Sequence, residues 1–84
     1  MSRKEKLIER LKRRPHDFTW HELVSLLGHF GYQQIKTGKT AGSRQRFVHP
    51  AYPIIILHKP HPSEILKRYQ VDQVLEILHK EGLL

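Results

Sequence analysis

Cysteine is absent from the 84 residues, which excludes a disulfide framework, a thiolate nucleophile and a thiolate metal site. Long apolar runs are missing as well. Charges interrupt the N-terminal stretch MSRKEKLIERLKRRP well short of a signal-peptide core or a membrane span. We therefore expect one cytoplasmic domain over residues 1–84, with a single modest core and its function on the surface.

Acidic residues are scarce in two parts of the chain, and the net charge is +7 with a sequence pI near 10.1. Met1 to Arg14 contains seven basic and two acidic residues, so this arm supplies +5 of the charge. No Asp or Glu lies between Tyr32 and Ser63. The cations of this central segment are Lys36, Lys39, Arg44, Arg46 and Lys59. Two separated basic regions favour an anionic partner such as RNA.

Hydrophobic spacing predicts three helices, of which the first covers residues 3–14 and ends at Pro15. The second begins after Thr19, which can form a capping box with Glu22, and Gly28 or Gly31 ends it. The third runs towards Gly82, which provides its exit. Their apolar stripes are Leu7, Ile8 and Leu11; Trp20, Leu23, Val24 and Leu27; and Val71, Val74, Leu75 and Leu78.

Strand patterns occupy the centre of the chain. The segments YQQIK and RQRFVH predict two short strands joined by the loop TGKTAGS. Ile54 to Leu57 is a continuous aliphatic run, typical of a strand buried on both faces, and Pro60 and Pro62 end it. We expect an α+β fold in which helices lie on one face of three antiparallel strands. The outer side of the third strand then needs a cover, which the first helix, a second copy of the chain or a partner protein could supply.

Three segments together resemble the HicA-type toxins of bacterial toxin–antitoxin pairs: GSRQRF on the second strand, HKPHP after the third, and LKRYQVDQVLEILHKEGL in the closing helix. The resemblance covers residues 18–84 and leaves the basic helix of residues 1–15 as an addition. It implies an α-β-β-β-α fold like that of double-stranded-RNA-binding domains. It also implies cleavage of messenger RNA without a metal or other cofactor, and a HicB-type antitoxin as partner.

One position departs from the family's pattern. The family's Gly-Ser-His triplet carries its catalytic histidine, whereas the matching residues here are Gly42, Ser43 and Arg44. An arginine stays protonated and is a poor general base, but it can bind a phosphate or stabilise negative charge in a transition state. His58 or His61, at the end of the third strand, is then the candidate for proton transfer. The sequence leaves open which of the two faces outward.

Three functions remain open from the residues. The first is an endoribonuclease that uses His58 or His61 with Arg44, and that binds RNA through the central cations. The second is a non-catalytic module that binds RNA or a partner protein, and the third is a structural subunit without a nucleic-acid partner. No metal site is expected, because the two histidines of HKPH have no third ligand nearby in sequence. The remaining histidines belong to no recognisable constellation: His16, His21, His29, His49 and His79.

Overall fold

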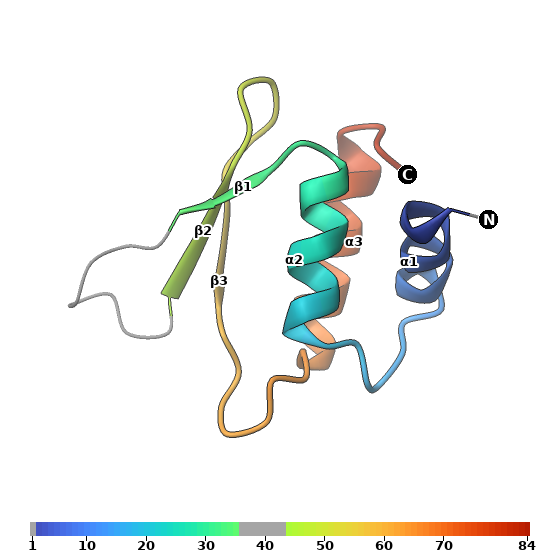
Figure 1. Ribbon diagram of the computed structural model, residues 1–84, viewed down its shortest axis with the longest axis vertical. Helices are drawn as coiled ribbons and strands as arrows, with labels where there is room; N and C mark the ends of the chain where they lie inside the picture. The colour runs from blue at the N-terminus through green and yellow to red at the C-terminus, as the bar shows by residue number, and fades with distance from the viewer. Residues whose placement is uncertain (1, 36–43) are drawn as a thin grey trace.

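The structure, a computed structural model, describes residues 2–35 and 44–84, and its elements follow the predicted order (Figure 1). The helices are α1 (Arg3–Lys12), α2 (Trp20–His29) and α3 (Arg68–Lys80). The strands are β1 (Gln33–Ile35), β2 (Arg44–Val48) and β3 (Ile55–His58). The fold class is α+β, as the sequence predicts.

The predicted end signals of α2 and α3 are present. The Thr19 hydroxyl accepts a hydrogen bond from the Glu22 backbone N–H at 3.1 Å, and the Glu22 carboxylate accepts one from the Thr19 N–H at 3.0 Å. This is the predicted capping box, which satisfies two N–H groups that a helix start leaves unpaired. Gly31, not Gly28, provides the exit from α2, because its φ of +95° disfavours any side chain. Gly82, with φ of +72°, follows α3 in the same way.

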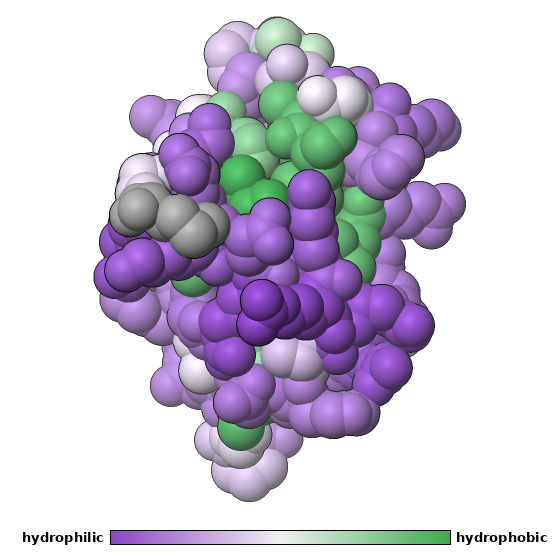
Figure 2. Space-filling view, turned by 90° about the vertical axis from the view of Figure 1, so that its right-hand side faces the viewer, coloured by the Kyte–Doolittle hydropathy of each residue, from purple (hydrophilic) through white to green (hydrophobic). Residues whose placement is uncertain are grey.

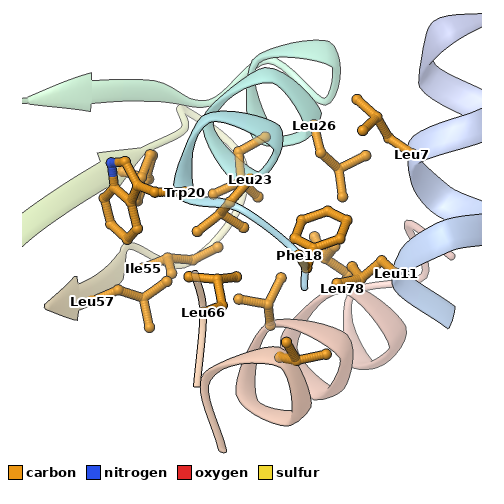
Figure 3. Close-up of a cluster of buried hydrophobic side chains, with 14 of the residues drawn as sticks. Leu7, Leu11, Phe18, Trp20, Leu23, Leu26, Ile55, Leu57, Leu66 and Leu78 are labelled. Atoms are coloured by element: carbon orange, nitrogen blue, oxygen red, sulfur yellow. The ribbon is translucent and has the colours of Figure 1, made fainter. Parts of the chain in front are cut away.

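The three strands form an antiparallel sheet in the order β1-β2-β3, and α2 and α3 lie on one of its faces (Figure 1). Side chains alternate along a strand, so Phe47, Ile55 and Leu57 point towards the helices, where each is at most 3% exposed. Trp20, the first residue of α2, packs on Phe47 with ring centroids 5.7 Å apart. Figure 3 shows Leu66, which precedes α3, in the same cluster. The main core therefore lies between the sheet and the helix pair.

The first helix forms a third layer on the side of the helix pair that faces away from the sheet (Figure 1). Leu7 and Leu11 are buried against Phe18, Leu26 and Leu78 (Figure 3). The alternative that this helix covers the outer side of the third strand is therefore wrong. The physical reason is that α2 and α3 carry apolar side chains on both sides, and the short stripe of α1 covers the second side.

Arginines of the N-terminal arm hold this layer in place. The Arg10 guanidinium lies 2.7 Å from the Glu22 carboxylate and 3.1 Å from that of Asp17. Arg14 forms a bidentate ion pair with Asp72 on α3, with N–O distances of 2.7 and 2.9 Å. Part of the arm's positive charge is thus neutralised inside the chain. Figure 2, which views the molecule from the α1 side, shows a mostly hydrophilic surface with one apolar strip in its upper half.

The predicted burial of both faces of the third strand is wrong. Ile54 precedes β3 and is 48% exposed, and Ile56 is half-buried, whereas Ile55 and Leu57 are fully buried. All described helices lie on one side of the sheet, so alternate residues of the aliphatic run face outward (Figure 1). We call this outward side of the sheet the open face.

Candidate functional site

The centre of the candidate site is a cross-strand pair on the open face. Arg44, the first residue of β2, lies directly opposite His58, the last residue of β3. Both side chains are exposed, since Phe47 and Leu57 take the alternate positions that face the helices. Directly opposite residues in an antiparallel pair have Cβ atoms about 4.5–5.5 Å apart. A guanidinium and an imidazole are therefore within joint reach of one phosphate group.

A buried glutamine fixes the backbone beneath this pair. Gln70, in the first turn of α3, is only 2% exposed. Its amide nitrogen donates to the carbonyl oxygen of His58 at 2.8 Å, and its amide oxygen accepts from the Lys67 N–H at 3.0 Å. The end of β3 and the start of α3 are thus joined through one side chain. Burial of Gln70 agrees with its spacing, since Gln70, Val74 and Leu78 follow the i, i+4, i+8 pattern of the buried stripe.

The loop between β3 and α3 brings further titratable groups to the same end of the molecule. Lys59 is ion-paired with Glu64 at 2.8 Å. The backbone carbonyl oxygen of Glu64 accepts a hydrogen bond from the Trp20 N–H at 2.7 Å, and Ile65 forms an isolated antiparallel β-bridge with Thr19. The loop therefore lies against the start of α2. Of the predicted RNA-binding cations, Lys59 is therefore partly neutralised by Glu64 within the chain.

Positive charge favours the ionised form of the Glu64 carboxylate. The hydrogen bond from Lys59 holds the pKa of Glu64 below its ordinary value, and the charges of His61 and His21 act in the same direction. His61 follows Lys59 in the loop between β3 and α3. His21 is in the first turn of α2, next to Trp20, whose N–H bonds to the Glu64 carbonyl oxygen.

His49 has a structural role that its sequence context did not indicate. One ring nitrogen accepts from the Ala51 N–H at 2.9 Å, and the other lies 3.1 Å from the Phe30 carbonyl oxygen. The ring also packs between Tyr32 and Tyr52, with centroid distances of 5.1 and 4.6 Å. His49 thus ties the turn between β2 and β3 to the end of α2, and it is distant along the sheet from His58.

The other predicted RNA-binding residues divide into two groups. Arg46 is exposed on the open face, between Ile35 of β1 and Ile56 of β3 in the strand register. Lys36 and Lys39 lie outside the described residues, as do Gly42 and Ser43. Within residues 2–35 and 44–84, no three His, Asp or Glu side chains group in a way that could hold a metal ion. No helix in that part of the chain is long and apolar enough to cross a membrane.

Comparison with protein families agrees with this arrangement of elements. The family model described as the HicA toxin of bacterial toxin-antitoxin matches residues 20–79. The chain belongs to the HicA toxin family. The match runs from the first residue of α2 almost to the end of α3, so it contains the Arg44–His58 pair and Gln70 and leaves α1 outside. No curated protein and no solved structure gives a significant match.

Proposed function

We propose that this HicA toxin is an endoribonuclease that cleaves messenger RNA in the cytoplasm without a metal ion. The observation that carries the proposal is the register of β2 and β3, which pairs Arg44 with His58 on the open face. Cleavage of this kind needs a base near the ribose 2′-hydroxyl, a proton donor at the leaving oxygen and a cation at the phosphate. Arg44 supplies the cation, and His58 and His61 supply the two proton-transfer groups.

The proposed chemistry is an internal displacement at phosphorus. His58 takes the proton of the 2′-hydroxyl, and the 2′-oxygen then forms a bond to phosphorus while the bond to the 5′-oxygen breaks. His61 gives a proton to the departing 5′-oxygen, which leaves a 2′,3′-cyclic phosphate on one fragment and a 5′-hydroxyl on the other. The Arg44 guanidinium stabilises the additional negative charge on the phosphate oxygens during this step.

The test is cleavage of messenger RNA by the purified protein in the presence of a chelator. His58→Gln and His61→Gln should each reduce the cleavage rate by about 100-fold or more, which is typical for loss of a general acid or base. His79→Gln is the matched control, because His79 is also an exposed histidine but lies in the last turn of α3. Cleavage at the full rate by both site variants, or cleavage that requires added Mg²⁺, would contradict the proposal.

A second function is favoured by one specific feature, the arginine at the family's catalytic position. In this alternative the protein binds RNA or a partner through Arg44 and Arg46 and does not cut. Binding would weaken steeply with salt, because cations that contact phosphates release counterions. Growth arrest that Arg44→Ala relieves and that neither histidine substitution relieves would support this function over cleavage.

The family implies a cognate antitoxin, and we propose that it is of the HicB type. The open face also carries the exposed aliphatic side chains of Ile35 and Ile54, at 45% and 48%. Such side chains suit a protein surface better than they suit RNA. A HicB-like reading frame beside this gene, and a stable complex of the two products, would support the proposal. A homodimer is the other arrangement, which light scattering on the isolated toxin distinguishes.

A further inference from the structure

Tyr69 is the most exposed large hydrophobic side chain in the part of the chain that the structure describes, at 61%. It is the second residue of α3, and the helix buries Gln70 and Val71 instead. The ring contributes little to the core, so the stability of the fold does not explain it. An exposed aromatic ring on a basic surface provides a π-face on which a nucleic-acid base can stack.

Two cationic residues stand next to this ring in the sequence. Lys67 and Arg68 precede it directly and both are exposed. The nearest acidic residues in sequence, Glu64 and Asp72, are already paired with Lys59 and Arg14 at 2.8 and 2.7 Å. Arg68 is held by His16, at 3.2 to 3.3 Å from its ring nitrogens, and this leaves the Lys67 ammonium as the more available cation. The charge of segment 65–71 therefore complements a polyanion.

The position of the segment connects it to the candidate site. The Gln70 side chain bonds to the carbonyl of His58 and to the N–H of Lys67, so these two backbone positions lie on either side of one amide group. β3 is an edge strand of the sheet, so a strand of RNA with its scissile phosphate at His58 and Arg44 on the open face can pass around this edge to the start of α3 on the other side. A base that lies one or a few nucleotides along the RNA from the scissile phosphate can reach Tyr69.

We propose that Lys67 and Tyr69 form a binding surface for single-stranded RNA, in which the Tyr69 ring stacks on a base next to the cleaved bond and Lys67 contacts a phosphate. The proposal rests on the proposed function and specifies its substrate. Bases inside a duplex are already stacked and paired, so an aromatic platform selects a single strand. Neither residue belongs to the set of central cations: Lys67 is the N-cap of α3 and Tyr69 is its second residue.

The test measures binding of a short 2′-O-methyl RNA oligonucleotide, which lacks the 2′-hydroxyl nucleophile and cannot be cut. Tyr69→Ala should weaken binding by about 5- to 150-fold, the range for loss of one base–aromatic stack of about 1–3 kcal/mol. Tyr69→Phe keeps the ring and should bind within twofold of the wild type. His79→Ala removes another exposed ring, from the last turn of the same helix, and serves as the matched control. A 2-aminopurine base in the oligonucleotide should lose fluorescence on binding to the wild type and to Tyr69→Phe, but not to Tyr69→Ala.

The outcomes separate this inference from the proposed function. If the wild type binds and cuts RNA and Tyr69→Ala does both equally well, the inference is wrong while the endoribonuclease stands. If the wild type binds no RNA even at low salt, both fail. Duplex RNA that binds as tightly as the single strand would overturn the inference. A change in oligomeric state in Tyr69→Ala would also overturn it, because the ring would then belong to an interface between copies.

Discussion

Gln70→Leu should destabilise the fold and weaken cleavage together, because one buried amide joins the end of β3 to the start of α3. Leucine has a similar volume, so the substitution removes two hydrogen bonds without opening a large cavity. Lys67 is exposed, and its N–H can turn to water. The His58 carbonyl loses its amide partner at the edge of the core, and an unsatisfied group of this kind costs about 1–3 kcal/mol. We expect the free energy of unfolding to fall by about 2 kcal/mol in total.

Trp20 provides the assay, because it is the single tryptophan and only 4% exposed. Its fluorescence should report a lower urea midpoint, and the melting temperature should fall by roughly 8–16 °C at 4–8 °C per kcal/mol. Under conditions where the variant is folded, kcat for RNA cleavage should fall more than KM rises, since His58 is displaced while the cations remain. Gln73→Leu on the same helix is the control and should change stability by about 0.5 kcal/mol or less. An unchanged urea midpoint for Gln70→Leu would refute the reasoning.

Two further predictions concern the docking of α1. The hydrogen bond from Arg10 is the largest effect on the pKa of Glu22 and holds that pKa below the ordinary value of 4.5. The ionised carboxylate therefore stabilises the fold above pH 4.5. This stability is lost as the pH falls through the lower pKa of the folded state. Arg10→Met should therefore lower the free energy of unfolding by about 1 kcal/mol at pH 7, a modest value because the Arg10 side chain is 35% exposed. In urea titrations below pH 4.5, the difference between this variant and the wild type should shrink. A difference that persists unchanged at low pH would show that the ion pair is not its source. Leu11→Ala should cost about 2–5 kcal/mol, because Leu11 is fully buried between α1 and the helix pair, whereas Ile8→Ala at a half-buried position should cost less. Equal and small losses for both variants would mean that α1 is not docked.

Much of the fold follows from local signals that the sequence states plainly. The Thr19–Glu22 capping box depends only on residues three apart, and the glycine exits depend on single positions. The three antiparallel strands were predicted within one or two residues of their bounds. These features are short-range, so they can be predicted from composition and spacing alone.

The errors all concern which surfaces meet in space. An aliphatic run such as Ile54 to Leu57 has the same composition whether one or two of its faces are covered. Only the position of the helices decides that Ile54 is exposed and Ile55 buried. The location of α1 depends in the same way on residues far along the chain, since Arg14 pairs with Asp72. Contacts between distant segments leave no periodic pattern in the sequence.

The candidate site contains both local features that the sequence predicts and contacts between distant segments that it does not. Strand alternation from the apolar Phe47 is sufficient to direct Arg44 to the open face, whereas the register that pairs β2 with β3 cannot be derived from the sequence. The structure adds that His58, not an inward residue, lies opposite Arg44. Gln70 and Glu64 were not predicted, because each joins the site through a contact between separate elements.

The register of the two strands also bears on Arg44, which stands where the resemblance to the family's Gly-Ser-His triplet leads us to expect a histidine. Directly opposite residues of an antiparallel pair project from the same face, about 5 Å apart. A histidine on β3 can therefore serve the same phosphate as a histidine at the start of β2, while an arginine at that start supplies charge instead. Cleavage depends on which groups surround the phosphate and not on which strand carries each one. Arg44 and His58 on opposite strands can thus bring a cation and a proton-transfer group to one phosphate, as the proposed chemistry requires.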